Sequence, residues 1–344
     1  MKHQSLSRFT GLSFQNGKRL ANRVVVPPMA SETADAQGFV TDKTLSHYQR
    51  LSQSRAGLVM VEYTYVDVSG RSEEKQLGAH SEEHIHGLSA LAQVIHQSGA
   101  LVGIQLTHAG GKTTRDLTGG ALMGPSPVAV PVKDRVLETM DPMSETDIEL
   151  WKGWFKSAVV RAKKAGFDLV ELHAAHGYGL NQWLSPLTNH RSDSYGGTLD
   201  RRARLLLEIV REVRAEHSDL LLAVRMPGQD FMEGGLRSSE AIWLAQSLER
   251  TGIDVIDVSS GIGGWRRPRN RTDEGYLVDE ASAIQASVDT PVIGVGGIET
   301  GAYIDQSLSQ GRFALAAVGR AILKDPGLWG DTHLAESVIP SISA

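Results

Sequence analysis

Eight short runs rich in β-branched residues recur along this chain, and segments with helical spacing of apolar residues separate them. Strands that alternate with helices in this way are the signature of a (β/α)8 barrel. We therefore expect an α/β fold, a TIM barrel formed as a single domain over residues 1–344. The runs are VVVP (24–27), LVMVE (58–62), LVGIQL (101–106), DLVEL (168–172), LLAVR (221–225), DVIDVS (254–259), PVIGVG (291–296) and LAAVG (315–319).

The C-terminal strand ends are where such barrels carry their chemistry. In this chain most of the predicted strands end in side chains with an obvious chemical use, or in paired glycines. We therefore treat these positions as the candidate site. In chain order they are Pro28, Met29 and Ala30, then Glu62, Gln105, His173 with His176, Arg225, Ser259 with Ser260, Gly296 with Gly297, and Gly319 with Arg320.

Composition limits the partners. The chain has no cysteine, which excludes disulfides, iron–sulfur clusters and a cysteine nucleophile. Its 35 basic and 40 acidic residues give a formal net charge of −5, so no basic field attracts nucleic acid or an anionic membrane. The N-terminal segment lacks the apolar core of a signal peptide, and no apolar run is long enough to span a bilayer. We expect a cytoplasmic protein with small-molecule partners, which could form a homo-oligomer.

A long irregular stretch, residues 108–143, follows the third predicted strand and is rich in glycine and proline. Insertions at that end of a barrel usually form lids or substrate walls, so we expect a cap over the barrel mouth rather than a mere surface excursion. The sequence SETD at 144–147 resembles a helix capping box, and apolar residues then recur at helical spacing until Gly166. A helix should therefore lead into the fourth strand.

The densest chemistry follows the fourth strand, where His173 and His176 lie three residues apart and Tyr178 two residues further on. Two imidazoles and a phenol at one strand end can donate hydrogen bonds to a single oxygen, which favours stabilisation of a developing oxyanion. A zinc site completed by Glu171 or His108 is the rival interpretation, although the spacing matches no helical zinc motif. A third alternative is that one histidine is only structural.

Glycines follow the seventh and eighth strands, where barrels commonly bind phosphate. Gly296, Gly297 and Gly319 would let backbone N–H groups approach an oxyanion, and Arg320 adds a fork-shaped donor. The alternative is that these glycines only form turns.

Gln105 and Arg225 end the third and fifth strands. An amide and a guanidinium suit the edge of a planar heterocycle, and a cation there would stabilise an anionic reduced form of the ring. Either residue could instead be a structural hydrogen-bond or salt-bridge partner. The residues by themselves thus indicate a phosphate-bearing planar cofactor beneath an oxyanion-binding pair.

With these residues in view, the sequence closely resembles the old yellow enzyme family of FMN-dependent ene-reductases, from Leu12 to about Pro326. Within the family, His176 and the single-domain length make the chain more similar to the bacterial thermophilic-type branch. The motifs that carry the resemblance are NRVVVPPM (22–29), GLVMVE (57–62), QLTHAG (105–110), HAAHGY (173–178), LSPLTNHR (184–191), DSYGGTL (193–199) and RRAR (201–204).

The resemblance implies tightly but non-covalently bound FMN, reduced by NADPH or NADH. Pro28, Met29 and Ala30 would lie along the isoalloxazine. Gln105 would bind its pyrimidine edge and Arg225 would lie near N1 and O2. The phosphate would be held by Gly296, Gly297, Gly319 and Arg320.

The resemblance also implies the substrates, which are α,β-unsaturated carbonyl or nitro compounds. His173 and His176 would bind the substrate oxygen, so that hydride adds at the β-carbon. Tyr178 would protonate the α-carbon, unless it only packs in the loop and water supplies the proton.

This chain departs from the family pattern at three places. Ala30 stands where the related branch commonly has a flavin-adjacent cysteine, which alters the expected redox potential. Tyr63 replaces a small residue, and its ring could crowd the flavin face or reach into the substrate pocket. Residues 326–344 lack the arginine and tryptophan tail with which some relatives complete a neighbour's active site, so we do not expect dimer-dependent chemistry.

A basic loop after the sixth strand, residues 263–271, contains four arginines. It could receive the phosphates of a nicotinamide cofactor or an acidic or CoA-linked substrate, or it could be merely solvated. Two alternative functions stay open from the residues themselves. One is a flavin-free, phosphate-binding lyase or isomerase, and the other is a non-catalytic flavin-binding protein.

Overall fold

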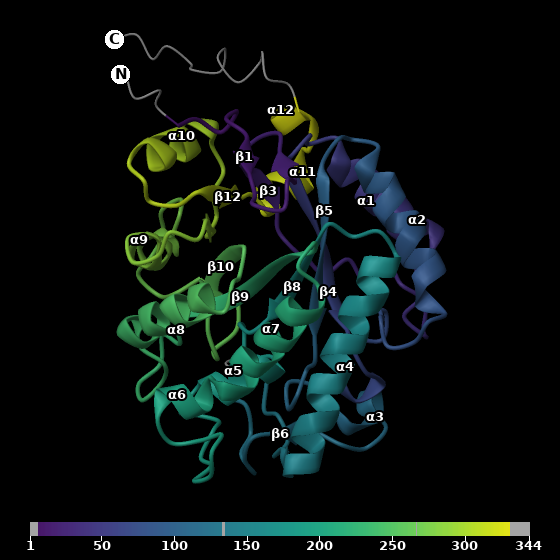
Figure 1. Ribbon diagram of the computed structural model, residues 1–344, viewed down its shortest axis with the longest axis vertical. Coiled ribbons are helices and arrows are strands. Elements are labelled where there is room, and N and C mark those ends of the chain that lie inside the picture. Colours follow the sequence, from purple (N-terminus) through teal and green to yellow (C-terminus); the bar gives the residue numbers. More distant parts are fainter. Residues whose placement is uncertain (1–5, 133–134, 266, 331–344) are drawn as a thin grey trace.

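The eight predicted runs are all strands of one closed parallel barrel. The computed structural model describes residues 6–132, 135–265 and 267–330. The barrel order is β3, β4, β5, β8, β9, β10, β11 and β12, which pairs back with β3 (Figure 1). The strand bounds are β3 Val24–Val26, β4 Leu58–Tyr65, β5 Leu101–Thr107, β8 Leu169–His173, β9 Leu221–Gln229, β10 Val255–Ser260, β11 Val292–Gly294 and β12 Leu315–Ala317. The prediction of a TIM barrel is confirmed.

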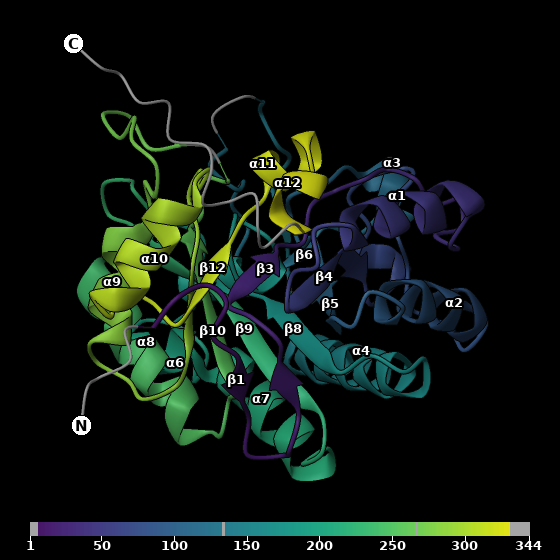
Figure 2. The same cartoon turned by 90° about the horizontal axis from the view of Figure 1, so that it is seen from above.

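Helices surround the barrel, with α8, α9 and α10 on one side and α1, α2 and α4 on the other (Figure 2). Helix α4 begins after Ser144, whose side chain and that of Asp147 form the predicted capping box, and it ends at Lys164. Gly166 follows with a φ of +91°, a value that favours glycine. The bounds are α1 Asp42–Ser52, α2 His84–His96, α4 Glu145–Lys164, α7 Arg204–Glu216, α8 Ser238–Arg250, α9 Val278–Gln285, α10 Gly301–Ser309, α11 Arg320–Lys324 and α12 Gly327–Gly330.

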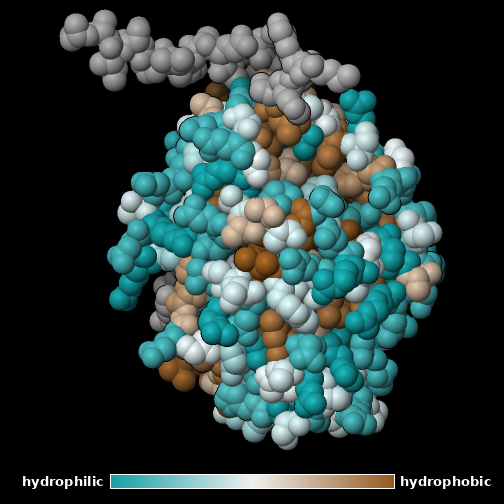
Figure 3. All heavy atoms as spheres, turned by 60° about the vertical axis from the view of Figure 1, so that its left-hand side comes forward, coloured by the Kyte–Doolittle hydropathy of each residue, from teal (hydrophilic) through white to brown (hydrophobic). Residues whose placement is uncertain are grey.

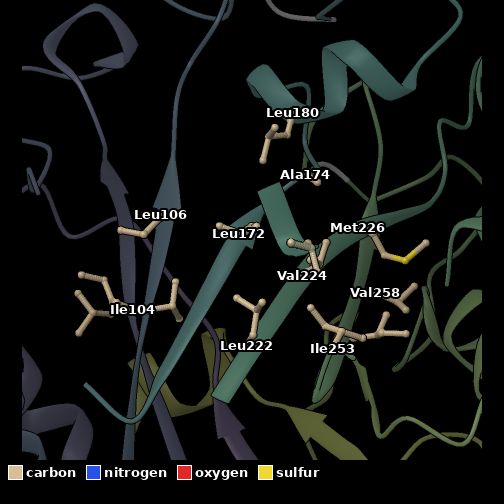
Figure 4. Close-up of a cluster of buried hydrophobic side chains, with 14 of the residues drawn as sticks. Ile104, Leu106, Leu172, Ala174, Leu180, Leu222, Val224, Met226, Ile253 and Val258 are labelled. Atoms are coloured by element: carbon tan, nitrogen blue, oxygen red, sulfur yellow. The ribbon is translucent and has the colours of Figure 1, made fainter. Parts of the chain in front are cut away.

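Alternation along the strands separates an outer from an inner face. Outward side chains such as Ile104, Leu172 and Val224 belong to the core between strands and helices (Figure 4). At the N-terminal end, inward side chains form a second apolar cluster, which includes Leu58, Leu169 and Leu221. A short antiparallel hairpin of β1 (Leu12–Ser13) and β2 (Arg19–Leu20) packs against that cluster through buried Leu20 and closes that end of the barrel.

The insertion after β5 lies where the sequence predicts a cap. It contains α3 (Arg115–Thr118) and the paired short strands β6 (Met123–Gly124) and β7 (Asp141–Pro142). Its buried Val130, Leu137 and Met140 form an apolar cluster with Ile262, which follows β10. The insertion therefore packs on a loop at the C-terminal end of the barrel, where it is joined by α5 (Gly179–Leu184), α6 (Leu199–Arg202) and the 3-10 turn η1 (Val68–Gly70).

On the face shown in Figure 3, hydrophilic side chains predominate and apolar groups occur in several separate places. None of the helices in the described ranges combines the length and hydropathy that crossing a bilayer requires.

That residues 1–344 form one domain stays a prediction, because residues 1–5 and 331–344, with most of the tail considered above, lie outside the described residues.

Candidate active site

His173, His176 and Tyr178 converge at the end of β8. The ring centroids of His173 and His176 are 5.1 Å apart at nearly a right angle, and the Tyr178 ring lies 4.9 Å from that of His173. A tight turn produces this convergence, because His176 and Gly177 have φ values of +58° and +77°. All three side chains are buried or nearly so. The structure thus brings together the three residues that the sequence singles out.

The environment of these side chains fixes their protonation. Burial lowers the pKa of both histidines well below its ordinary value, and the nearby cations Arg225 and Lys112 lower it further. Burial also raises the pKa of Tyr178 to about 12, although hydrogen bonds with Ser72 and Tyr63 oppose this shift. At neutral pH the cluster therefore presents two neutral imidazoles and a neutral phenol, each of which can donate a hydrogen bond.

Two further residues hold this cluster, and sequence reasoning missed the role of both. Lys112, from the insertion, donates a hydrogen bond from Nζ to the backbone oxygen of His176 at 2.6 Å, and lies 4.3 Å from the Tyr178 ring centroid. Ser259 of β10 lies 2.6 Å from Nε2 of His176. A hydroxyl at that nitrogen can fix the tautomer of the imidazole. The sequence placed Ser259 at a predicted strand end and so among the candidate residues, whereas no pattern in the sequence indicated Lys112.

Gln105 and Arg225 lie next to the histidine pair, since Arg225 is the register partner of His173 and Gln105 that of Glu171, two residues before His173. Gln105 donates from Nε2 to Oε1 of Glu171 at 2.7 Å, and Nε of Arg225 lies 3.1 Å from Oδ2 of Asp257. Both pairs join residues that face each other in the strand register. Gln105 and Arg225 are therefore also structural hydrogen-bond and salt-bridge partners, as the alternative interpretation expected, because Glu171 and Asp257 fix their side chains.

The carboxyl groups of Glu171 and Asp257 behave as a pair. Burial raises the pKa of both, and the neighbouring Asp257 carboxylate drives that of Glu171 well above its usual range. The Arg225 guanidinium opposes the shift of Asp257. Glu171 is therefore the protonated member at neutral pH, and Asp257 is the anion that balances Arg225. Asp257 is an acidic residue inside the apolar run DVIDVS, and strand alternation could have placed it inside the barrel.

The glycines predicted to form a phosphate cradle lie in the loops after β11 and β12. A Cβ built on Gly296 would lie 2.6 Å from the backbone nitrogen of Leu277, and φ values of +130° and +69° at Gly296 and Gly297 favour glycine. A Cβ on Gly297 would lie 3.1 Å from a terminal nitrogen of Arg320, and one on Gly319 would lie 3.2 Å from Sδ of Met29. The four predicted residues and Met29 therefore lie close together, and side chains are excluded from the cradle.

Pro28 and Met29 are half-buried and Ala30 is exposed in the segment after β3. Glu62 anchors this segment, because its carboxylate accepts hydrogen bonds from the backbone of Ser31 at 2.8 Å and from the Ser31 hydroxyl. Burial raises the pKa of Glu62 to about 7.

Tyr63 is nearly buried, and its ring centroid lies 5.5 Å from that of Tyr178. The Tyr63 ring therefore lies beside Tyr178, the predicted proton donor.

The residues of the metal alternative lie apart. His108 lies against Trp151, with ring centroids 4.3 Å apart and planes tilted by 40°, and hydrogen-bonds with Ser69. Glu171 is engaged with Gln105. Neither joins the histidine pair as the zinc interpretation requires. Within the described ranges, no group of three histidine, aspartate or glutamate side chains is arranged to hold a metal ion.

Comparison with known proteins agrees with this geometry. Residues 7–333 match the NADH:flavin oxidoreductase / NADH oxidase family. The chain is 38% identical over 328 residues to an NADPH dehydrogenase of Halalkalibacterium halodurans, covering 95% of this chain and 93% of that protein. It is 36% identical over 308 residues to an NADPH dehydrogenase of Bacillus subtilis, covering 89% and 88%.

Solved structures share the fold. An old yellow enzyme homologue from Zymomonas mobilis superposes with a TM-score of 0.81 at 24% identity, covering 94% of this chain and 91% of the other. Morphinone reductase gives a TM-score of 0.81 at 22% identity, covering 98% and 91%.

The family match extends over nearly the whole chain and identifies it as an oxidoreductase. It supports FMN as the cofactor with NADPH or NADH as the reductant, as the sequence resemblance implied. The flavin-free lyase or isomerase and the non-catalytic flavin-binding protein are thereby ruled out. The barrel, its buried histidine pair and the matched sequence agree that the chain belongs to the NADH:flavin oxidoreductase / NADH oxidase family, the old yellow enzymes.

Proposed function

We propose that this protein is an ene-reductase, which uses NADPH or NADH to reduce the C=C bond of α,β-unsaturated carbonyl or nitro compounds. The observation that carries the proposal is the convergence of His173, His176 and Tyr178 in one buried cluster beside Arg225, the register partner of His173 on the neighbouring strand. An oxyanion-binding pair and a proton donor would thus lie beside the side chains that suit a planar cofactor.

The residues present fit FMN. A glycine cradle beside Arg320 suits its phosphate, because added side chains would clash there. Gln105 and Arg225 suit the polar edge of its ring, and Pro28, Met29 and Ala30 would lie along the ring. When bound, FMN carries two electrons from NADPH or NADH to the alkene.

The two histidines would bind the substrate oxygen as neutral donors. Nδ1 of His173 is buried and has no hydrogen-bond partner among the described residues. Burial strengthens the hydrogen bonds of such donors to a developing negative charge, because little water screens them. Ser259, at Nε2 of His176, would keep that ring oriented.

Tyr178 would deliver the proton to the α-carbon. With a pKa of about 12 the phenol keeps its proton at neutral pH, and a carbanion-like carbon is far more basic than a phenolate. The alkene would thereby gain a hydride, which brings both electrons, at its β-carbon and a proton at its α-carbon. Tyr63 narrows the space beside Tyr178 and would limit the size of the substrate.

Absorption spectroscopy tests this function. The full-length protein is reduced under anaerobic conditions with NADPH, or in parallel with NADH, and then mixed with 2-cyclohexen-1-one. We expect the visible flavin band to bleach and then to return. Tyr178→Phe should bleach normally, but its band should return roughly 100-fold more slowly. If the band bleaches but does not return with enones or nitroalkenes, ene-reduction is disproved, although the assignment as an oxidoreductase still holds.

A further inference from the structure

The basic loop after β10 separates into residues with different surroundings. Arg271 forms a bidentate ion pair with Glu280, at 2.6 and 2.8 Å, and lies over the ring of Phe231. Arg269 is exposed. Arg266 lies outside the described residues. Arg267 is also exposed, but its guanidinium extends to the glycine cradle after β11.

Two guanidinium groups flank the same point above Gly297. A Cβ built on this glycine would lie 3.1 Å from a terminal nitrogen of Arg267 and equally 3.1 Å from one of Arg320. These arginines come from different parts of the chain, the loop after β10 and the start of α11. Their approach is therefore produced by the fold.

Contacts on its other sides hold Arg267 in this position. Its guanidinium lies 4.6 Å from the ring centroid of Tyr276, and its Nη1 donates to the backbone oxygen of Thr272 at 2.7 Å. The Tyr276 ring in turn lies 2.9 Å from the position of a Cβ on Gly297. One planar group is thus stacked and tethered beside the cradle, which reduces the entropy lost when it binds a ligand.

The charge at this point is unbalanced. Among the residues that the structure describes, neither Arg267 nor Arg320 has an ion pair with an acidic side chain, whereas Arg271 and Arg312 each have one. Two like charges that face one point repel each other, and an anion between them removes that cost. Guanidinium forks bind phosphate oxygens in pairs, so a terminal phosphate is the anion that this arrangement suits.

We propose that Arg267 is a second phosphate-binding arginine, which acts with Arg320 to clamp the terminal phosphate of FMN over Gly297. The inference rests on the phosphate cradle of the proposed function and adds a residue from a third loop. It also gives the basic loop a role that is distinct from binding a nicotinamide cofactor or a CoA-linked substrate. The clamp would make this protein select FMN over riboflavin, which has the same ring system but no phosphate.

Flavin titrations test the clamp. Full-length wild-type protein and the variants Arg267→Ala, Arg267→Lys, Arg320→Ala and Arg269→Ala are freed of flavin and titrated with FMN and separately with riboflavin, followed by flavin fluorescence. We expect Arg267→Ala to weaken FMN binding about tenfold and to leave riboflavin binding within about twofold, since one charge-assisted contact is lost. Arg267→Lys should recover part of the loss. Arg269→Ala removes the same charge from the same loop and should bind both flavins as the wild type does.

The outcomes separate this inference from the function on which it rests. If Arg320→Ala weakens FMN binding and Arg267→Ala does not, Arg267 is no phosphate ligand and the cradle stands. If Arg267→Ala weakens FMN and riboflavin equally, the residue acts on loop structure and the clamp is disproved. If neither substitution weakens FMN binding more than riboflavin binding, the phosphate cradle itself is wrong.

Discussion

The two ends of the barrel interior differ in composition, although the same strands build both. On β9, Leu221 and Ala223 belong to the apolar cluster at the N-terminal end, whereas Arg225, the next inward residue, lies in the polar layer. β8 changes in the same way from Leu169 to Glu171. The environment therefore changes over two residues, about 7 Å of strand.

The apolar N-terminal end of the barrel interior stabilises the fold, whereas the polar C-terminal end carries the groups that could take part in chemistry. The apolar end gains stability from burial alone and tolerates no polar group without a partner. The polar end contains Gln105, Glu171, Arg225 and Asp257 at the cost of desolvation, which mutual pairing offsets. Side chains at this end are therefore interdependent, whereas those at the other end contribute mainly as individual packed groups.

The sharpest test of this interdependence removes one charge from the polar layer. Asp257→Asn would leave the buried Arg225 cation without its counter-ion, and we expect the free energy of unfolding to fall by about 3–5 kcal/mol. Urea denaturation at pH 7 measures the loss.

The matched variant is Glu171→Gln, which keeps shape and hydrogen-bonding capacity in the same layer. Because Glu171 is the protonated member of the pair, this change should cost less than about 1 kcal/mol. Equal losses from the two variants would show that the charge assignment is wrong.

A second test asks whether the polar end contributes to catalysis. His173→Ala removes one of the two donors to the substrate oxygen, and kcat/KM for an enone should fall about 100- to 1,000-fold. Anaerobic stopped-flow measurement of flavin reoxidation gives this rate. The visible spectrum of the bound flavin is the control and should be unchanged. A loss below about threefold would remove His173 from the proposed site.

The opposite result is expected at the apolar end. Leu221→Ala removes a fully buried side chain from the N-terminal cluster, and the free energy of unfolding should fall by about 3 kcal/mol. Flavin reduction by NADPH and reoxidation by the enone should stay within twofold of the wild type. A large change in either rate would mean that the two ends of the barrel are coupled, and would break the comparison.

A smaller effect should appear with pH, because His108 is buried against Trp151 and burial lowers its pKa to about 3. The unfolded chain binds a proton at this residue near pH 6.5, whereas the folded chain does not. His108 therefore leaves the free energy of unfolding unchanged above about pH 6.5 and lowers it progressively as the pH falls from 6.5 towards 3. At pH 5 the loss is about 2 kcal/mol.

Unfolding measured at pH 7 and pH 5 reports the sum of this loss and the losses from the other buried histidines, such as His173 and His176. His108→Gln should reduce it, and His86→Gln, at an exposed position on α2, should not. The same decrease in both variants would show that His108 does not cause it.

Local sequence patterns predicted most of the fold. The eight strands, the helix after Ser144 and the insertion after the third strand all lie where the sequence places them. Strand periodicity and capping are local properties, so they can be recognised without knowing what the chain packs against. The residues of the candidate site were predicted because barrel strands end at one face, which brings together positions as distant as Gln105 and Arg320.

Partnerships within that face could not be predicted in the same way. The alternation of side chains along a strand could have placed Asp257 inside the barrel, but the residue lies within the largely apolar run DVIDVS, and its pairing with Arg225 has no local signal. Lys112 and Arg267 lie in irregular loops, where no periodicity indicates the direction of a side chain.

The sequence by itself thus determined the barrel, its strand ends and the kinds of side chain available there. Only the tertiary structure decided which of them meet. Gln105 contacts Glu171 across 66 positions, and Lys112 contacts His176 across 64. Such contacts depend on the register of neighbouring strands and the path of long loops. Those are set by packing of the whole core, and no local stretch of sequence encodes them.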